Sequence, residues 1–199
     1  MKQRLFIAID LPEEFKEKID KLNKEIIAGR LLHNYYPKFV PPNNLHLTLL
    51  FLGYVEEKLI APINKAIEKV AADFSTFKLE TDKILLAPPK GPYRMLWILF
   101  KNSTQYNLLQ KNLKKTVLDT FSFHNQKLHL NLPSERLIHV TLARLKHTVN
   151  KSEAEKIILP TLDEREMKVV NITLYKSILK SSGAEYEVLF KFQFRINDH

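Results

Sequence analysis

The chain has 199 residues, with 31 Lys and Arg against 22 Asp and Glu, so its formal net charge is +9. A hydrophobic content of 45% with 27% charged residues is typical of a globular protein and excludes a disordered polyelectrolyte. The absence of Cys excludes disulfides, thiolate metal sites and cysteine nucleophiles, and the 4 Gly residues form no glycine-rich phosphate loop.

The sequence before the Pro- and Gly-rich break at 88–92 alternates between strand and helix patterns. Short apolar runs predict the strands, and apolar residues three or four positions apart predict the helices. In order, the predicted elements are a strand at 5–9, a helix with the apolar stripe Leu11, Phe15, Ile19, Leu22 and Ile26, a loop at 34–44, a strand at 45–52 ended by Gly53, a helix with the stripe Leu59, Ile63, Ala66 and Val70, and a strand at 77–86.

After the break the same order begins again. The predicted elements are a strand at 95–100, a helix with the stripe Leu109, Leu113, Val117 and Phe121, a strand at 137–145, a helix opened by a capping box of Ser152 and Glu155 and ended by Pro160, and strands at 167–179 and 186–196 joined by a turn at 181–183. Because strand–helix–strand–helix–strand occurs twice, the sequence predicts a duplicated α+β unit. We expect one domain over 1–199, with repeat halves 1–92 and 93–199.

One short motif occurs in both halves. It is His46-Leu47-Thr48-Leu49 in the first half and His139-Val140-Thr141-Leu142 in the second, 93 residues later. One copy would be weak evidence, but two copies at matching places in a repeat point to a shared role.

Strand geometry explains why this spacing matters. Side chains alternate between the two faces of a strand, so His46 and Thr48 share one face, and His139 and Thr141 share one face. Two lobes related by a rough two-fold axis would bring both pairs to a common groove. One neutral imidazole there can take a proton from water, and the other, as imidazolium, can protonate a leaving alkoxide. The threonine hydroxyls can donate hydrogen bonds to phosphate oxygens, so the motifs predict acid–base chemistry on a phosphodiester.

Other interpretations remain open. The histidines can be ordinary buried strand residues, or ligands of a metal, although no HExxH, HxH or acidic partner accompanies either motif. The basic excess between Lys101 and Lys151 suits RNA or nucleotide phosphate, and a solvated helix face explains it equally well. The apolar run at 5–9 is too short for a signal peptide or a membrane span, so we expect a cytoplasmic protein that does not bind a membrane.

At these motifs the chain resembles a known family. The segments 44–53 (NLHLTLLFLG) and 139–144 (HVTLAR) are similar to the two signature motifs of bacterial and archaeal RNA 2′,3′-cyclic phosphodiesterases. These LigT-like proteins, also called 2′-5′ RNA ligases, belong to the two-histidine phosphoesterase superfamily. The segments 6–12 and 174–177 give further support.

The resemblance implies a bilobal α+β fold in which two antiparallel sheets line a central groove and helices lie outside. It implies hydrolysis of a 2′,3′-cyclic phosphate on RNA to a 2′-phosphomonoester, with His46 as proton donor and His139 as proton acceptor. Thr48 and Thr141 would bind the phosphate, without a metal or another cofactor. The partner would be RNA or an oligonucleotide with a cyclic phosphate end, and we expect a monomer. The alternatives are 2′-5′ RNA ligation as a minor activity and a non-catalytic RNA-binding protein.

Three further residues give expectations that the structure can test. Arg144 matches the family motif and can neutralise phosphate charge, but strict alternation places it on the face opposite to His139. Trp97 lies in the middle of a predicted strand, which favours burial in the core over base stacking. Phe39, in the loop before the first motif, is expected to pack rather than to stack on a base.

Overall fold

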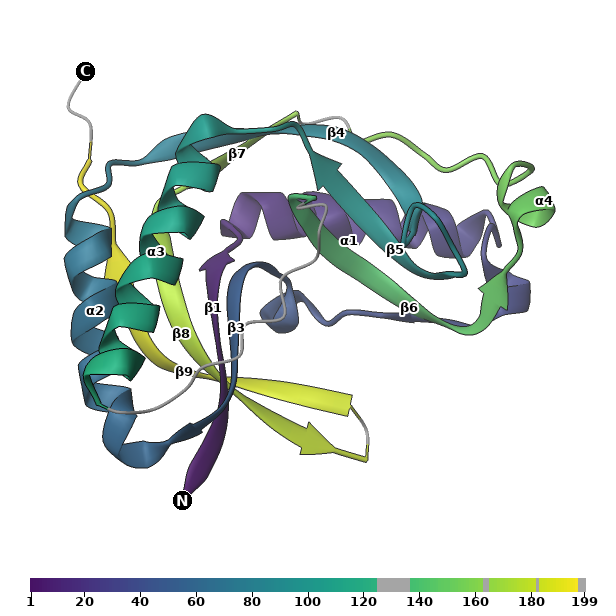
Figure 1. Cartoon of the computed structure of the whole chain (residues 1–199). Coiled ribbons are helices and arrows are strands. Elements are labelled where there is room, and N and C mark those ends of the chain that lie inside the picture. Colours follow the sequence, from purple (N-terminus) through teal and green to yellow (C-terminus); the bar gives the residue numbers. More distant parts are fainter. Residues whose placement is uncertain (125–136, 163–164, 182, 197–199) are drawn as a thin grey trace.

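The computed structural model describes residues 1–124, 137–162, 165–181 and 183–196 (Figure 1). Its elements in chain order are β1 (Lys2–Asp10), α1 (Glu13–Ala28), η1 (His33–Tyr35), β2 (Pro37–Phe39), η2 (Pro42–Asn44), β3 (His46–Glu56), η3 (Glu57–Leu59), α2 (Ile60–Ala72), β4 (Phe77–Ala87), β5 (Tyr93–Phe100), α3 (Thr104–Phe123), β6 (His139–Val149), α4 (Lys151–Ala154), β7 (Glu166–Val169), β8 (Asn171–Lys180) and β9 (Gly183–Gln193).

The three long helices bury the stripes predicted from their spacing. Every residue of the three stripes is at most 8% exposed. Apolar residues three or four positions apart share one face of a helix, and that face is the one that covers the sheet. The predicted helices and their buried faces are therefore confirmed.

Within the described residues, nine strands form one curled antiparallel sheet. The strand order is β7-β4-β5-β6-β3-β1-β8-β9, and β2 pairs with part of β6. In the middle of this order, β3 and β6 are paired through Leu47 and Val140, which are both fully buried. The two sheets expected from the sequence are thus joined into one at this pair.

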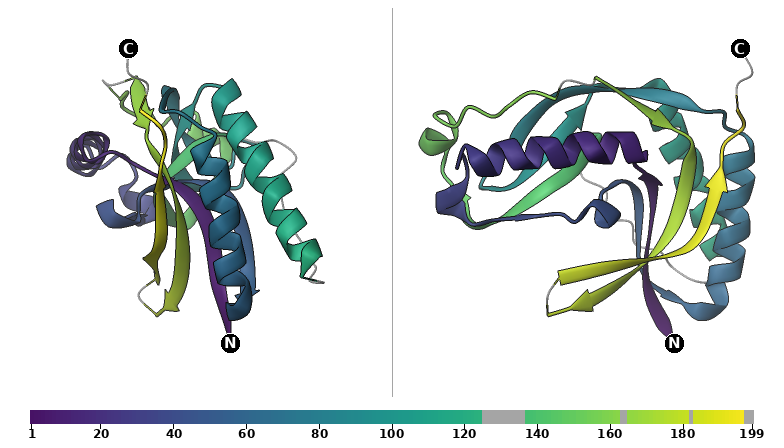
Figure 2. Two further views of the ribbon diagram at one scale, coloured as in Figure 1. Left: turned by 90° about the vertical axis from the view of Figure 1, so that its left-hand side faces the viewer. Right: turned by 180° about the vertical axis from the view of Figure 1, so that it is seen from behind.

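The sheet divides at that junction into two lobes with matching strand orders. The first lobe contains β3, β1, β8 and β9, and the second contains β6, β5, β4 and β7. Helices α2 and α3 cover the first lobe, and α1 covers the second (Figures 1 and 2). The α+β class and the duplicated arrangement are as predicted.

The chain passes between the lobes more than once, so neither lobe comes from one half of the sequence alone. Strand β4, from the first half, pairs with β5, and strands β8 and β9 return to β1 (Figure 2). This interleaving closes both lobes around one hydrophobic core, which includes residues from α1, α2 and α3.

Some predicted boundaries are wrong. The strand predicted at 167–179 is two strands, because the chain leaves the second lobe after β7 and enters the first lobe as β8. Strand β3 does not end at Gly53 but continues to Glu56, with Gly53 at φ +69° next to a register shift against β1. Glycine suits that backbone conformation, and the shift is a β-bulge rather than a strand end. Within the predicted turn at 181–183, Ser182 lies outside the described residues.

The capping box is also misplaced in the prediction. Asn150, not Ser152, caps α4, and its side chain accepts a hydrogen bond from the backbone N–H of Glu153 while the Glu153 carboxylate accepts one from the N–H of Asn150. Helix α4 ends at Ala154, well before Pro160. Asn is a cap as good as Ser, and the two overlapping patterns differ by only two positions.

Candidate active site

The two His-x-Thr motifs lie on the two strands that meet at the centre of the sheet. In β3 and in β6 the burial pattern begins with a half-buried His, a fully buried aliphatic residue and a half-buried Thr. The face opposite to the histidines belongs to the core, as the alternation predicts.

The pair Leu47–Val140 fixes how the motifs face each other. Because the strands are antiparallel, the next positions along this register set His46 across from Thr141 and Thr48 across from His139. By this register, the imidazole of each motif lies on the same side of the Leu47–Val140 pair as the hydroxyl of the other motif. The sequence-predicted histidines and threonines are brought together at one place.

Both imidazoles are held by the same local hydrogen bond. Nδ1 of His46 lies 2.7 Å from the carbonyl oxygen of Asn44, and Nδ1 of His139 lies 2.9 Å from that of Leu137. A carbonyl only accepts, so Nδ1 carries the proton and donates it in both cases. Nε2 is then the nitrogen left for proton transfer on each ring.

Burial lowers the pKa of both imidazoles below the usual value. For His46 the hydrogen bond to Asn44 and the negative charge of Asp10 act in the opposite direction, while His139 and Arg144 lower the pKa further by repulsion. For His139 only the hydrogen bond to Leu137 opposes burial.

A β-bulge turns Arg144 onto the histidine face. Trp97 on β5 pairs with Thr141, but its neighbour Leu96 pairs with Ala143, so Leu142 is an extra residue in β6. The alternation therefore shifts by one position, Ala143 enters the core and Arg144 is exposed. The sequence-based placement of Arg144 on the opposite face is wrong for this reason.

The first motif contains the same bulge. Ala8 on β1 pairs with Thr48 and Ile7 pairs with Leu50, so Leu49 is the extra residue. The residue equivalent to Arg144 is then Phe51, which is 57% exposed. One lobe presents a guanidinium beside its motif, and the other presents a phenyl ring.

At each bulge, backbone carbonyl oxygens accept hydrogen bonds from groups outside the paired strands. In β3, the buried Gln110 of α3 donates to the carbonyl of Leu49 at 2.9 Å, and the hydroxyl of Tyr106 donates to that of Thr48 at 3.0 Å. In β6, the backbone N–H of Val40 donates to the carbonyl of Leu142 at 2.8 Å. These bonds hold the irregular backbone that aims the motif side chains.

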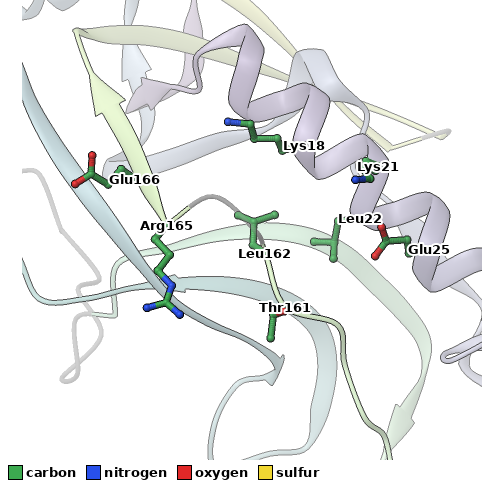
Figure 3. Close-up of a pocket in the computed structure, with 8 residues that line it drawn as sticks. All are labelled: Lys18, Lys21, Leu22, Glu25, Thr161, Leu162, Arg165 and Glu166. Carbon is green, nitrogen blue, oxygen red and sulfur yellow. The ribbon is translucent and has the colours of Figure 1, made fainter.

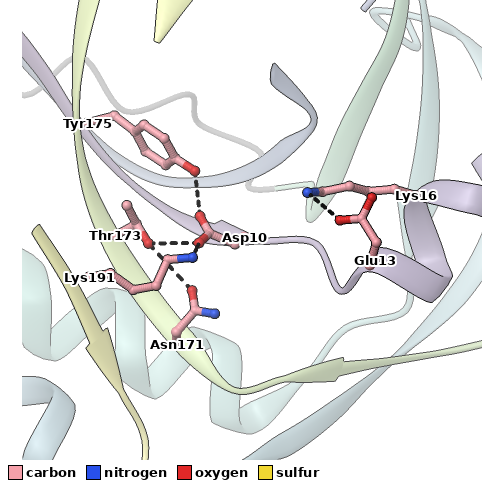
Figure 4. Close-up of polar contacts among 7 residues, drawn as sticks. All are labelled: Asp10, Glu13, Lys16, Asn171, Thr173, Tyr175 and Lys191. Carbon is pink, nitrogen blue, oxygen red and sulfur yellow. Dashed lines mark hydrogen bonds and ion pairs between the residues drawn. The ribbon is translucent and has the colours of Figure 1, made fainter. Parts of the chain in front are cut away.

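A mostly buried carboxylate lies beside His46, and the sequence analysis missed it. Asp10, at the end of β1, is the cross-strand partner of His46. Its oxygens accept hydrogen bonds from the hydroxyl of Tyr175 at 2.5 Å and the hydroxyl of Thr173 at 3.1 Å, and Nζ of Lys191 lies 2.5 Å away (Figure 4). Burial and Asp10 raise the pKa of Tyr175, so that hydroxyl remains a donor. The signal in the sequence was an acidic residue that directly ends an apolar strand.

The surroundings of the two histidines differ. The cross-strand partner of His139 is Leu99, an aliphatic residue where His46 has Asp10. The ring of Trp97 stacks on His139, with ring centroids 3.7 Å apart and planes 18° apart, where the first lobe has only Ala8. Trp97 is half-buried, so the expectation of a core tryptophan holds only in part.

Aromatic rings surround His46 on the other sides. Phe6 and Tyr186 have ring centroids 4.9 Å and 5.1 Å from that of His46, and Phe6 stacks on Tyr175 at 5.0 Å. Phe39 packs against the core, as expected. The hydrogen bond from Asn44 Nδ2 to the carbonyl of Ala184, at 3.1 Å, ties the first motif to the β8–β9 hairpin.

Other features of the described residues lie apart from the motifs. No three His, Asp or Glu side chains there are grouped as metal ligands. No helix in the described ranges is long and apolar enough to cross a membrane. A surface pocket of about 530 Å³ between α1 and the segment that leads into β7 is lined by both acidic and basic residues and contains neither histidine (Figure 3).

Comparisons with known proteins agree with this geometry. The family model described as LigT like Phosphoesterase matches residues 9–97. An RNA 2′,3′-cyclic phosphodiesterase of Archaeoglobus fulgidus is 29% identical over 194 residues, covering 96% of this chain and 99% of that protein. One of Thermotoga maritima is 29% identical over 193 residues, covering 96% of this chain and 95% of that protein.

Solved structures share the fold over nearly the whole chain. The protein TT0787 of Thermus thermophilus superposes with a TM-score of 0.78 at 26% identity, covering 98% of this chain and 99% of that one. LigT of E. coli in its apo form superposes with a TM-score of 0.71 at 21% identity, covering 98% of both chains.

Proposed function

We propose that the chain, which is similar to the LigT-like phosphoesterases along nearly its full length, hydrolyses the 2′,3′-cyclic phosphate at the end of an RNA to a 2′-phosphomonoester. The relatives named RNA 2′,3′-cyclic phosphodiesterase align along nearly its full length. The observation that carries the proposal is the pair of imidazoles on either side of Leu47–Val140, each with Nδ1 bound to a carbonyl and Nε2 left for chemistry.

Two imidazoles on opposing strands suit an in-line displacement at phosphorus. A water oxygen attacks the phosphorus as Nε2 of His139 takes the water's proton. The bond from phosphorus to the 3′ oxygen breaks, and Nε2 of His46 gives its proton to that oxygen. The products are a 2′-phosphate and a free 3′ hydroxyl, with His139 protonated and His46 neutral until they exchange protons with solvent.

The surroundings of the histidines support this division of roles. Burial lowers the pKa of both imidazoles, but only His46 has a carboxylate, Asp10, that opposes this and favours the imidazolium form a proton donor needs. His139 has Leu99 as its cross-strand partner and Trp97 on its face, and this apolar environment favours the neutral form that a base needs. Asp10 thus acts through His46 as a positioning residue.

The remaining site residues bind the phosphate in this proposal. The hydroxyls of Thr48 and Thr141 donate to its non-bridging oxygens, where negative charge increases in the transition state. Arg144, on the same face, balances that charge. The chemistry is proton transfer and hydrogen bonding by these side chains, so the proposal includes no metal or cofactor.

The test is turnover of an RNA ending in a 2′,3′-cyclic phosphate, in the presence of EDTA. We expect a 2′-phosphate product, and His46→Ala and His139→Ala should each lower kcat/KM by about 10²–10⁴-fold. The matched control is His124→Ala, since His124 is exposed at the C-terminal end of α3 and belongs to neither motif. Full activity in the variant that lacks both histidines would refute the proposal.

Other products distinguish the alternatives. RNA binding without turnover would indicate a binding protein, and a 3′-phosphate product would mean that the 2′ oxygen leaves. In ligation through the same groove, a 5′ hydroxyl of a second RNA would replace water as the nucleophile, and the high concentration of water opposes this. The single domain over 1–199, a monomeric state and a cytoplasmic location remain part of the proposal, and the monomer is tested by sedimentation.

A further inference from the structure

The histidine face of β6 continues beyond Arg144 into an exposed strip. Lys38 on β2 pairs directly with Arg144, so both side chains lie on the same face. Lys146 follows two positions later, and its Nζ lies 5.6 Å from the centre of the Tyr36 ring. We name Tyr36, Lys38, Arg144 and Lys146 the β2–β6 strip.

Tyr36 is presented to solvent by an unusual backbone conformation. It is 61% exposed and has φ +49°, in the left-handed region that Gly or Asn normally occupies. The edge of its ring meets His147, with centroids 5.4 Å apart, but the ring fills no place in the core. A strained residue that packs against little points to a use outside the folded core.

The charge of the strip is positive. Arg144 contacts the sulfur of Met95 and Lys146 contacts the Tyr36 ring, and in the described part of the chain neither forms an ion pair with a carboxylate. Nζ of Lys38 reaches the β8–β9 hairpin, where a Cβ on Gly183 would lie 3.4 Å from it. The strip therefore runs from the catalytic face of β6 past this hairpin.

Its length fits a short stretch of nucleic acid. From Thr141 to Lys146 the strand advances about 15 Å at its normal rise, allowing for the bulge. Stacked bases repeat about every 3.4 Å, so at most about four nucleotides can lie along this distance. Cations that follow a backbone, together with an exposed aromatic ring, are the features that bind single strands without reading their sequence.

We propose that the β2–β6 strip binds the single-stranded RNA that precedes the cyclic phosphate, with a base stacked on Tyr36 and phosphates contacting Lys146 and Lys38. The inference deepens the proposed function and rests on it. The occupant is RNA because the strip is continuous with the site that takes the terminal phosphate, and because its charge is complementary to a phosphate backbone. The strip would make the enzyme prefer an RNA end over a free cyclic nucleotide.

The experiment compares two substrates in one enzyme. One is a nucleoside 2′,3′-cyclic phosphate, which reaches only the histidines, and the other is a single-stranded RNA of about ten nucleotides with the same terminus. Tyr36→Gly removes the ring. Because glycine adopts φ +49° without strain, we expect this variant to fold like the wild type. We expect its kcat/KM for the RNA to fall about five- to a hundredfold, the value of one base stack, with less than about twofold change for the mononucleotide.

Further variants separate stacking from charge. Tyr36→Phe keeps the ring and should retain the preference for RNA. Lys146→Gln should reduce the salt dependence of RNA binding by about 0.7 in the logarithmic slope, as expected for one lost phosphate contact. The matched controls are Tyr54→Ala and Lys168→Gln, since Tyr54 is 66% exposed on β3 and Lys168 is exposed on β7.

Three results would overturn the inference. They are an unchanged RNA preference in Tyr36→Gly, an equal loss on both substrates, and a wild-type enzyme that does not favour the RNA. If the protein turns over neither substrate, the proposed function fails. RNA binding by the strip is then measured separately, by fluorescence anisotropy with an RNA that ends in a 2′-phosphate. Tyr36→Gly must then bind that RNA at least about fivefold more weakly than wild type, and equal binding refutes the strip.

Discussion

Asp10→Asn tests the role of the carboxylate beside His46 with almost no change in shape. The wild-type carboxylate accepts hydrogen bonds from Tyr175 and Thr173 and pairs with Lys191. An amide keeps one accepting oxygen and replaces the other with a donor, so one charge-assisted bond and the ion pair are lost. A hydrogen bond to a charged group contributes about 1.5–3 kcal/mol, and the site is mostly buried, so we expect a loss of about 1–3 kcal/mol.

The activity should change in a particular direction with pH. Removing the negative charge lowers the pKa of His46 further, so the donor loses its proton at a lower pH. The alkaline limb of the kcat/KM profile should move to lower pH, and the acid limb should stay, because the pKa of His139 depends on burial and Leu137 rather than on Asp10. The loss should grow with pH, and it cannot exceed the roughly 10²–10⁴-fold contribution of a general acid.

The assay is a pH series of cyclic phosphate hydrolysis with a thermal melt of each variant. For a chain of 199 residues the expected stability loss lowers Tm by about 2–12 °C. Asp20→Asn is the matched control, since Asp20 forms an exposed pair with Lys24 on α1 at 2.7 Å, and it should cost at most about 0.5 kcal/mol without moving either limb. A lower Tm for Asp10→Asn with both limbs unmoved would show that Asp10 is only structural.

Three other outcomes follow from the site. Gln110→Leu leaves the buried carbonyl of Leu49 without its donor, so urea unfolding should show a loss of about 1–3 kcal/mol, and unchanged stability would contradict the role given to this bond. Burial lowers the pKa of His46 and His139 in the folded protein below the unfolded value of about 6.5. The stability that depends on their neutral forms is therefore complete above the unfolded pKa and is lost as pH falls through the pKa values of the folded protein. The variant with both changed to Ala should therefore lose less stability than wild type between about pH 8 and pH 5 in urea titrations. Arg144→Gln should lower kcat/KM by about 10²-fold with little change in Tm, and an equal rate would remove Arg144 from the site.

The sequence predicted the helices and the two motifs because both depend on local periodicity. The stripe of α1 follows from the helical repeat alone, and the shared face of His46 and Thr48 follows from strand alternation. The copy of the motif in β6 indicated the second half of the candidate site without knowledge of the topology.

The bulges and the crossing of the chain could not be predicted in the same way. An inserted residue such as Leu142 looks like any apolar strand residue, and only pairing with β5 shows that alternation shifts there and turns Arg144 around. The place of Asp10 beside His46 likewise depends on the register between β1 and β3. Register comes from contacts between distant segments, which a periodic pattern does not contain.

The buried pair Leu47–Val140 has a mechanical consequence. In the proposed mechanism the reacting nitrogens belong to the residues next to this pair, so the separation of proton donor and proton acceptor depends on how the two strands meet at Leu47 and Val140. Protein interiors are packed almost as densely as crystals, which makes that contact stiff. A displacement of about 1 Å at reacting groups can cost about 10²-fold in rate. We therefore expect the junction at two hydrocarbon residues, which take no part in the chemistry, to keep the two imidazoles at a fixed separation.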